Sequence, residues 1–185
     1  MAAGQRASAS ITLTVTDEDR TVAGLAILAI VIHLAEAALP SPIPGVKPGL
    51  ANVITLLAFQ RYGLRVAAWV SLLRVFGASL VGGTLLGPTF LMSLAGALAS
   101  LAALAALARV PRVSVLGLGV AAAQAHILGQ FALAWWVFVP HPGLVVLLPP
   151  LLLMAVVFGA LSGTITGLVE RDLAHARGSG AGLLS

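Results

Sequence analysis

The amino-acid sequence predicts an all-α membrane protein with six transmembrane helices in a compact bundle, and its composition is the first reason. Hydrophobic residues make up 59% of the 185 residues and charged residues only 9%, which is too little charge for the surface of an ordinary water-soluble domain. The apolar residues also form long runs with brief polar or proline-rich breaks. A bilayer core needs roughly 20 residues of helix, and most of the runs approach this length.

Six apolar runs follow one another along the chain. They cover residues 22–39, 50–62, 64–81, 90–107, 113–139 and 144–169. The second run is short, so it would be little tilted or partly re-entrant, and five spans are the main alternative. Residues 1–21 form a polar tail without the basic start of a signal peptide. We therefore expect one transmembrane domain, 22–170, between cytoplasmic tails at 1–21 and 171–185.

The positions of the cations predict the topology, because cytoplasmic loops carry the excess of Lys and Arg. Nine Lys and Arg residues lie in the loops and tails between and beyond the six spans. If the N-terminus is cytoplasmic, eight of these nine lie in the cytoplasm and only Lys47 lies on the outer side of the membrane. The eight are Arg6, Arg20, Arg61, Arg65, Arg109, Arg112, Arg171 and Arg177. We expect both termini in the cytoplasm and a multi-pass protein of a prokaryotic inner membrane.

The connection at residues 40–49 is unusual because it contains four prolines. Proline fixes φ and lacks an amide donor, which favours a stiff extended loop. On the outer face, this loop would form a wall or lid over the bundle.

Small residues recur at intervals of four in several expected spans, and such rows let helix backbones approach closely in lipid. We expect them to pack the bundle or to meet a partner subunit. The rows are Ala95, Ala99 and Ala103, beside Gly96 and Ser100; Ala121, Ala125 and Gly129; and Gly159, Gly163 and Gly167.

Polar side chains inside the expected spans are few, and in a bilayer such residues usually face the interior and often mark function. Besides the candidates below, His33, Thr55, Ser71 and Gln124 belong to this group. Five polar residues fall between the middle of the membrane and its outer surface, and Lys47 follows in the outer loop. We predict that these six bind a small organic solute: Glu36, Lys47, Asn52, Arg74, His126 and Gln130.

Several of these residues also have a purely structural interpretation. Arg74 could pair with Glu36 or bond backbone carbonyls at a broken helix. His126 could be a hydrogen-bonded core histidine, and Asn52 could cap a helix. Trp135 and Trp136 are typical of anchors at the membrane interface.

The sequence lacks the patterns of several other classes of protein. It contains no cysteine, which excludes disulfides, thiolate metal sites and thiol nucleophiles. Its aspartates are Asp17, Asp19 and Asp172, all in the tails, so no aspartate pair suits magnesium diphosphate. Neither a phosphate-binding loop ending in Lys-Ser or Lys-Thr nor a Gly-x-Ser-x-Gly motif occurs. We expect no enzymatic activity, metal or cofactor. Without a basic stripe, we expect no nucleic-acid partner.

The motif IPGVKPGLANVITLLA at residues 43–58 resembles the Gx transporter family, many of whose members are labelled heptaprenyl diphosphate synthase component I. The resemblance continues through LLRV at 72–75, SLAG at 93–96 and AHILGQ at 125–130, and it covers about residues 22–170. Pro48 stands where the family commonly has an aliphatic residue.

This family is similar to the substrate-binding subunits (S components) of energy-coupling-factor (ECF) transporters. The resemblance implies a six-helix membrane protein that captures a vitamin-like compound from outside. It also implies two partners, an energy-coupling transmembrane protein and ATPase subunits. Such subunits often dock through Ala-x-x-x-Ala in the first span, where this chain has only the approximate small face of Ala23, Ala26 and Ala29.

Two other functions remain open at this point. The synthase label is compatible with an accessory membrane protein of prenyl diphosphate or quinone metabolism. The tripeptide Ser162-Gly163-Thr164 resembles part of a covalent flavin attachment site but lacks the Ala-Thr ending. A membrane subunit of a flavin- or quinone-linked electron-transfer system is therefore the third interpretation.

Overall fold

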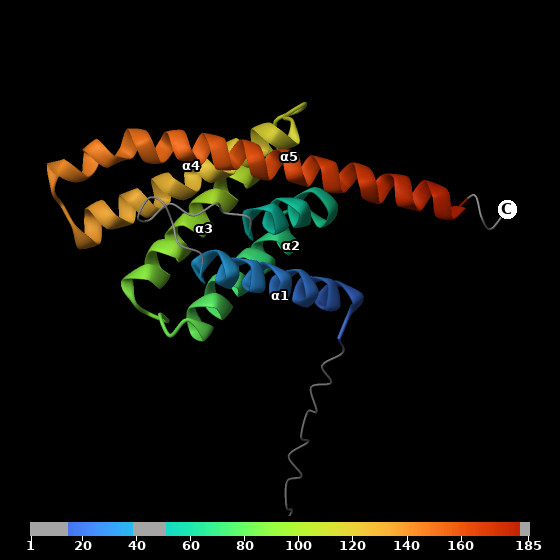
Figure 1. Ribbon diagram of the computed structural model, residues 1–185, viewed down its shortest axis with the longest axis horizontal. Coiled ribbons are helices and arrows are strands. Elements are labelled where there is room, and N and C mark those ends of the chain that lie inside the picture. The colour runs from blue at the N-terminus through green and yellow to red at the C-terminus, as the bar shows by residue number, and fades with distance from the viewer. Residues whose placement is uncertain (1–14, 39–50, 182–185) are drawn as a thin grey trace, which may run out of the picture.

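The computed structural model describes residues 15–38 and 51–181, and within these ranges it contains helices and no strand (Figure 1). The α-helices are α1 (Asp17–Ala38), α2 (Ala51–Val81), α3 (Pro88–Leu107), α4 (Val115–Leu133) and α5 (Leu148–Ala181). A π-helical turn, η1 (Ala134–Phe138), extends α4, and a 3-10 helix, η2 (Pro142–Leu147), leads into α5. The predicted all-α class is confirmed for this part of the chain.

Five helices in the described ranges are long and apolar enough to cross a bilayer. They mark a multi-pass membrane protein. Large apolar side chains point outward, including Leu86 at 77% exposure and Trp136 at 82%, as expected of a surface solvated by lipid. Trp135 instead stacks on Phe131, with ring centroids 6.3 Å apart.

The second and third expected spans both lie in α2, which is 31 residues long. Gly63 interrupts its helical geometry with φ 83° and ψ −178°, a backbone conformation that is essentially restricted to glycine. Figure 1 shows that the chain changes direction between the teal first part of α2 and its green second part. The element is therefore two helical segments, 51–62 and 64–81. Whether each segment crosses the membrane stays a prediction.

The helices form two groups that α2 joins. In one group α1 packs on α2, around a core that includes Ala29, Ile54 and Val70. In the other, α4 packs against both α3 and α5, and α2 contacts α3 and α5. The first residues of α1 and the last residues of α5 lie at one end of the molecule, and the α4–α5 connection lies at the opposite end (Figure 1).

Rows of small residues bring α3, α4 and α5 together. A Cβ atom placed on Gly129 of α4 would lie 2.6 Å from Ala99 Cβ and 2.7 Å from Ala95 O, both on α3. On the other side of α4, a Cβ on Gly159 of α5 would lie 2.7 Å from Gly119 O. The helices could not approach this closely with larger residues, so these rows pack helix against helix within the chain.

Candidate functional site

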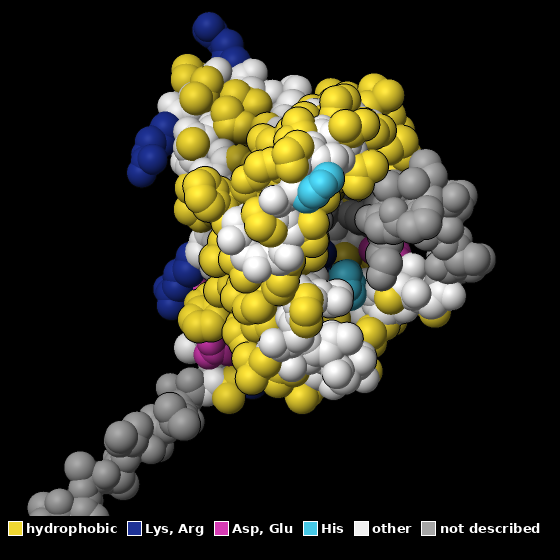
Figure 2. All heavy atoms as spheres, turned by 90° about the vertical axis from the view of Figure 1, so that its left-hand side faces the viewer, with side chains coloured by type: hydrophobic (Ala, Val, Ile, Leu, Met, Phe, Trp, Pro, Cys, Tyr) yellow, Lys and Arg dark blue, Asp and Glu magenta, His cyan; other side chains and the backbone are white. Residues whose placement is uncertain are grey.

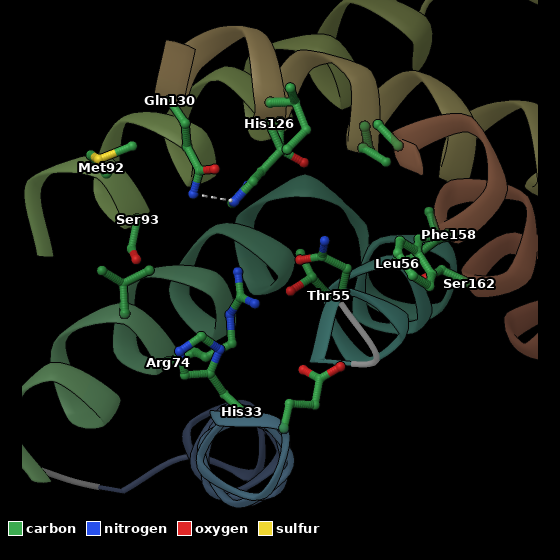
Figure 3. A pocket seen from close by; sticks show the side chains of 18 of the residues that line it. His33, Thr55, Leu56, Arg74, Met92, Ser93, His126, Gln130, Phe158 and Ser162 are labelled. Carbon is green, nitrogen blue, oxygen red and sulfur yellow. Dashed lines mark hydrogen bonds between the residues drawn. The ribbon is translucent and has the colours of Figure 1, made fainter. Parts of the chain in front are cut away.

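A cavity of about 350 Å³ lies between the α1–α2 group and the α3–α4–α5 group (Figure 3). This volume falls in the range of small-molecule sites. On the face of the molecule that carries the α4–α5 connection, Figure 2 shows a hollow among hydrophobic side chains, where a histidine and an acidic side chain are visible. Five of the six residues predicted to bind substrate line the cavity: Glu36, Asn52, Arg74, His126 and Gln130. Lys47 and the proline-rich loop lie outside the described residues.

Arg74 of α2 is the charged side chain at the centre of this arrangement. It is only 6% exposed, and its Nε has no hydrogen-bond partner. The ion pairs Arg20–Asp17, Arg61–Glu170 and Arg65–Glu18 do not include it, but the Glu36 carboxylate is near enough to attract its charge. Figure 3 shows the side chain extending from α2 into the cavity, toward His126 and Gln130 on α4. A buried guanidinium N–H without a hydrogen-bond partner among the described residues costs free energy, which water or a ligand in the cavity would offset.

His126 and Gln130 form the opposite wall, one turn apart on α4. The amide nitrogen of Gln130 lies 3.1 Å from His126 Nε2, while His126 Nδ1 has no hydrogen-bond partner. Gly96 of α3 makes room for both side chains. A Cβ there would lie 2.7 Å from His126 Nε2 and 2.9 Å from Gln130 Cγ. The His126 and Gln130 side chains therefore pack directly against Gly96, and there is no room for a larger residue at that position.

Glu36 lies near the C-terminal end of α1 and has a structural contact of its own. Its carboxylate is 4% exposed and accepts a hydrogen bond of 3.5 Å from the Ala51 amide at the start of α2. The first amides of a helix lack intrahelical partners and form its positive end, so a carboxylate is favourable there. Glu36 thus places the beginning of α2, where Asn52 and Thr55 line the cavity.

Thr55 and Gly96 belong to the site, although neither is among the six predicted residues. Thr55 is 5% exposed and its Oγ1 has no hydrogen-bond partner. Its spacing of three from Asn52 puts the two residues on one helix face, which was a usable signal. Nothing in the sequence shows that Gly96 faces His126, because that depends on how α3 packs against α4. His33 also lines the cavity.

The predicted docking residues lie on a different part of α1. Ala26 and Ala29 are 3% and 0% exposed and pack inside the protein, whereas Ala23 is exposed. Of the three, only Ala23 is accessible to a partner in this structure. The role of this face in docking stays a prediction.

Comparison with known protein families identifies the family of this chain. Residues 25–169, well over half of the chain, match the family described as heptaprenyl diphosphate synthase component I. The chain belongs to this family. The match confirms the suspected resemblance to the Gx transporter family. Neither the curated proteins nor the solved structures contain a significant match.

In this heptaprenyl diphosphate synthase component I family member, the aspartates lie away from the cavity. Asp17 and Asp19 are in the first turn of α1, and Asp172 is near the end of α5. None of them lines the cavity. Across residues 15–38 and 51–181, no three His, Cys, Asp or Glu side chains are grouped as a metal site would require.

The tripeptide at residues 162–164 lies within α5. Ser162 lines the cavity and is 5% exposed. A Cβ on Gly163 would lie 2.6 Å from Leu116 Cα of α4. Thr164 is exposed, and its hydroxyl donates a 2.8 Å hydrogen bond to Ala160 O, one turn earlier. The threonine hydroxyl thus bonds to its own helix and does not line the cavity.

Proposed function

We propose that this chain is a non-enzymatic, substrate-binding membrane subunit that resembles the S components of ECF transporters. It captures a small organic solute from the outer face of the cytoplasmic membrane. A partner transmembrane protein and ATPase subunits supply the energy for uptake. The observation that carries the proposal is the buried Arg74 side chain, which extends into a cavity of about 350 Å³ and whose Nε has no hydrogen-bond partner among the described residues.

The proposal includes six membrane crossings with both termini in the cytoplasm. The backbone break at Gly63 supports it, because Arg61 and Arg65 flank this break and cations favour the cytoplasmic side. The beginning of α1 and the end of α5 also lie at one end of the molecule. The hollow of Figure 2 faces the opposite end, which six crossings would place outside.

Single cysteines can test the number of crossings, since the natural chain has none. Val15 and Leu86 are 68% and 77% exposed and lie before α1 and between α2 and α3. If α2 crosses twice, Val15→Cys and Leu86→Cys react with an impermeant maleimide from opposite sides of the membrane. If α2 crosses once, both react from the same side, and the six-span topology is wrong.

Purification from the native membrane tests the function against its alternatives. The proposal expects an ATPase and an energy-coupling membrane protein to co-purify, and expects solute uptake that requires ATP. A co-purifying prenyl synthase would favour the accessory protein that the family description suggests. Bound flavin or a redox partner would favour the electron-transfer subunit. Native mass spectrometry of the same sample identifies any small molecule in the cavity.

A further inference from the structure

The cavity has two chemically different parts. Figure 3 shows Arg74, His126, Gln130 and Ser93 around one part, and Leu56, Phe158 and Ser162 around another. We propose that the ligand is a small organic acid with a single carboxylate, which binds at Arg74, and an apolar body, which lies against Leu56 and Phe158. This inference rests on the proposed function, because it names the class of solute that the subunit captures.

The polar part of the cavity is equipped for an acceptor with two oxygens. A guanidinium presents parallel N–H donors that match a carboxylate in a bidentate geometry. Figure 3 shows the end of the Arg74 side chain in the cavity, while its Nε is fully buried and has no hydrogen-bond partner among the described residues. The Thr55 hydroxyl is a second buried group without a partner and is able to donate. His126 Nδ1 is a third, which donates or accepts according to the tautomer of the ring.

The charge of the lining limits the charge of the ligand. Among the described residues that line the cavity, Arg74 is the only Lys or Arg, and Glu36 is the only carboxylate. A diphosphate carries several negative charges and would leave most of them unpaired in a buried site, which is costly. An ammonium group would be repelled by the guanidinium, and at Glu36 it would compete with the hydrogen bond from the Ala51 amide. One negative charge therefore suits the site best.

The apolar part accounts for the rest of the ligand. Leu56, Leu104 and Ala155 are buried, and Met154 and Phe158 complete this wall. Such a surface gains free energy when it covers apolar atoms, and Ser162 adds one hydroxyl beside it. A cavity of about 350 Å³ holds the equivalent of about a dozen water molecules at liquid density. The ligand is therefore compact, with an acid group at one end.

Three probes with one carbon skeleton test the assignment: phenylbutyrate, its primary amide and phenylbutylamine. Binding is measured by calorimetry on the full chain in phosphatidylcholine nanodiscs, where no anionic lipid competes. We expect the acid to bind at least about tenfold more tightly than the amide or the amine, since a charge-assisted pair is replaced by weaker contacts. Butyrate, which lacks the apolar body, should bind more weakly than phenylbutyrate.

Two variants link this preference to the cavity. Arg74→Gln should abolish the difference between acid and amide, because it removes the cation but keeps hydrogen-bonding capacity. Arg109→Gln is the matched control, since Arg109 lies in the α3–α4 connection outside the cavity, and it should keep the preference. Thermal unfolding of both variants shows whether they are folded.

The acid assignment is overturned if the amide or the amine binds as tightly as phenylbutyrate, if no acid binds, or if folded Arg74→Gln keeps the preference. A neutral or cationic solute that co-purifies together with the coupling proteins would also overturn it, while the proposed function would stand. Conversely, acid binding that depends on Arg74, in a chain that associates with no ATPase, would support the ligand class and contradict the transport function.

Discussion

Two interhelical regions of this chain contrast sharply: the α4–α5 seam and the gap between α2 and α4. In the seam, Gly119, Gly159 and Gly163 bring the two backbones together so closely that added Cβ atoms would meet backbone atoms. In the gap, Arg74 and His126 extend toward each other across an open cavity and carry nitrogen atoms without partners.

The contrast shows that the cavity does not result from generally poor packing. The same helix, α4, packs at backbone distance against α5 on one face and leaves a space of about 350 Å³ on another. Empty space with unsatisfied polar groups costs free energy on both counts. A polar occupant of the cavity would offset the second cost by pairing with these groups.

The largest expected effect comes from replacing Arg74 on the cavity side. Arg74→Gln should weaken ligand binding by about a hundredfold or more, because two charge-assisted hydrogen bonds are lost. The same change should alter the thermal stability of the ligand-free protein little, since it removes a buried N–H without a partner among the described residues but also the attraction between Arg74 and Glu36. Calorimetry and thermal unfolding of the purified variant measure the two effects.

The double mutant with Glu36 decides between a binding role and a structural pair. If the two residues form a purely structural ion pair, either single mutant loses about 3–5 kcal/mol of stability and Glu36→Gln with Arg74→Gln recovers much of it. The structure predicts partial coupling, because the Glu36 carboxylate attracts the Arg74 charge through space and also accepts a hydrogen bond from the Ala51 amide. A double mutant that binds normally would remove Arg74 from the site.

On the seam side, the comparison predicts opposite results for two glycines of α5. Gly163→Ala would put a Cβ 2.6 Å from Leu116 Cα and 2.9 Å from Val115 O, and backbone atoms cannot move aside cheaply. We expect a loss of about 1–3 kcal/mol in the free energy of unfolding. Gly167→Ala is the control, since nothing lies within 4 Å of its Cβ, and alanine should stabilise the helix slightly. Equal effects in a denaturant titration would mean that the seam is not tightly packed.

Replacement of Gly96 should affect both stability and ligand binding to an intermediate degree, because this glycine of α3 packs closely against two side chains that line the cavity. In Gly96→Ala the new methyl group would lie 2.7 Å from the His126 ring, which must rotate or shift away. We expect ligand affinity to fall by about tenfold while stability changes by about 1 kcal/mol or less, because a side chain moves more easily than a backbone. If Gly96→Ala instead lowers stability as much as Gly163→Ala and leaves affinity unchanged, the His126–Gln130 pair is a packing element only.

The sequence was sufficient to predict that buried charged residues line the interior and that small residues pack the helices closely. Arginine and glutamate inside apolar runs are so costly in lipid that their interior location follows from the sequence, and Arg74 and Glu36 indeed line one cavity. The rows of small residues likewise predicted close helix packing, which Gly129 and Gly159 make. In both cases the local pattern is compatible with only one arrangement of low free energy in a membrane: charged side chains face the interior, and small residues face a neighbouring helix.

Other features could not be predicted because they depend on how distant helices meet. Gly96 and Gly167 both belong to rows of small residues in apolar helices, yet one lies against His126 and the other has no atom within 4 Å of an added Cβ. Ala26 and Ala29 pack inside the protein, and their small size alone does not show which side of α1 is covered. The number of spans depends on the backbone at one residue, Gly63, whose positive φ no periodic pattern reveals.

The smallest expected effect concerns an ion pair that joins the two helix groups away from both the seam and the cavity. Arg61 Nε of α2 lies 2.8 Å from Glu170 Oε1 of α5, and the side chains are 17% and 30% exposed. Arg61→Gln should lower the free energy of unfolding by about 1 kcal/mol, less so at high salt, because partly solvated pairs are screened. Arg65→Gln is the control, since its contact with Glu18 is longer, at 3.6 Å, and more exposed. Arg61→Gln could also weaken ligand binding while Arg65→Gln does not. That result would mean that the Arg61–Glu170 ion pair holds α2 and α5 in the position that the cavity requires.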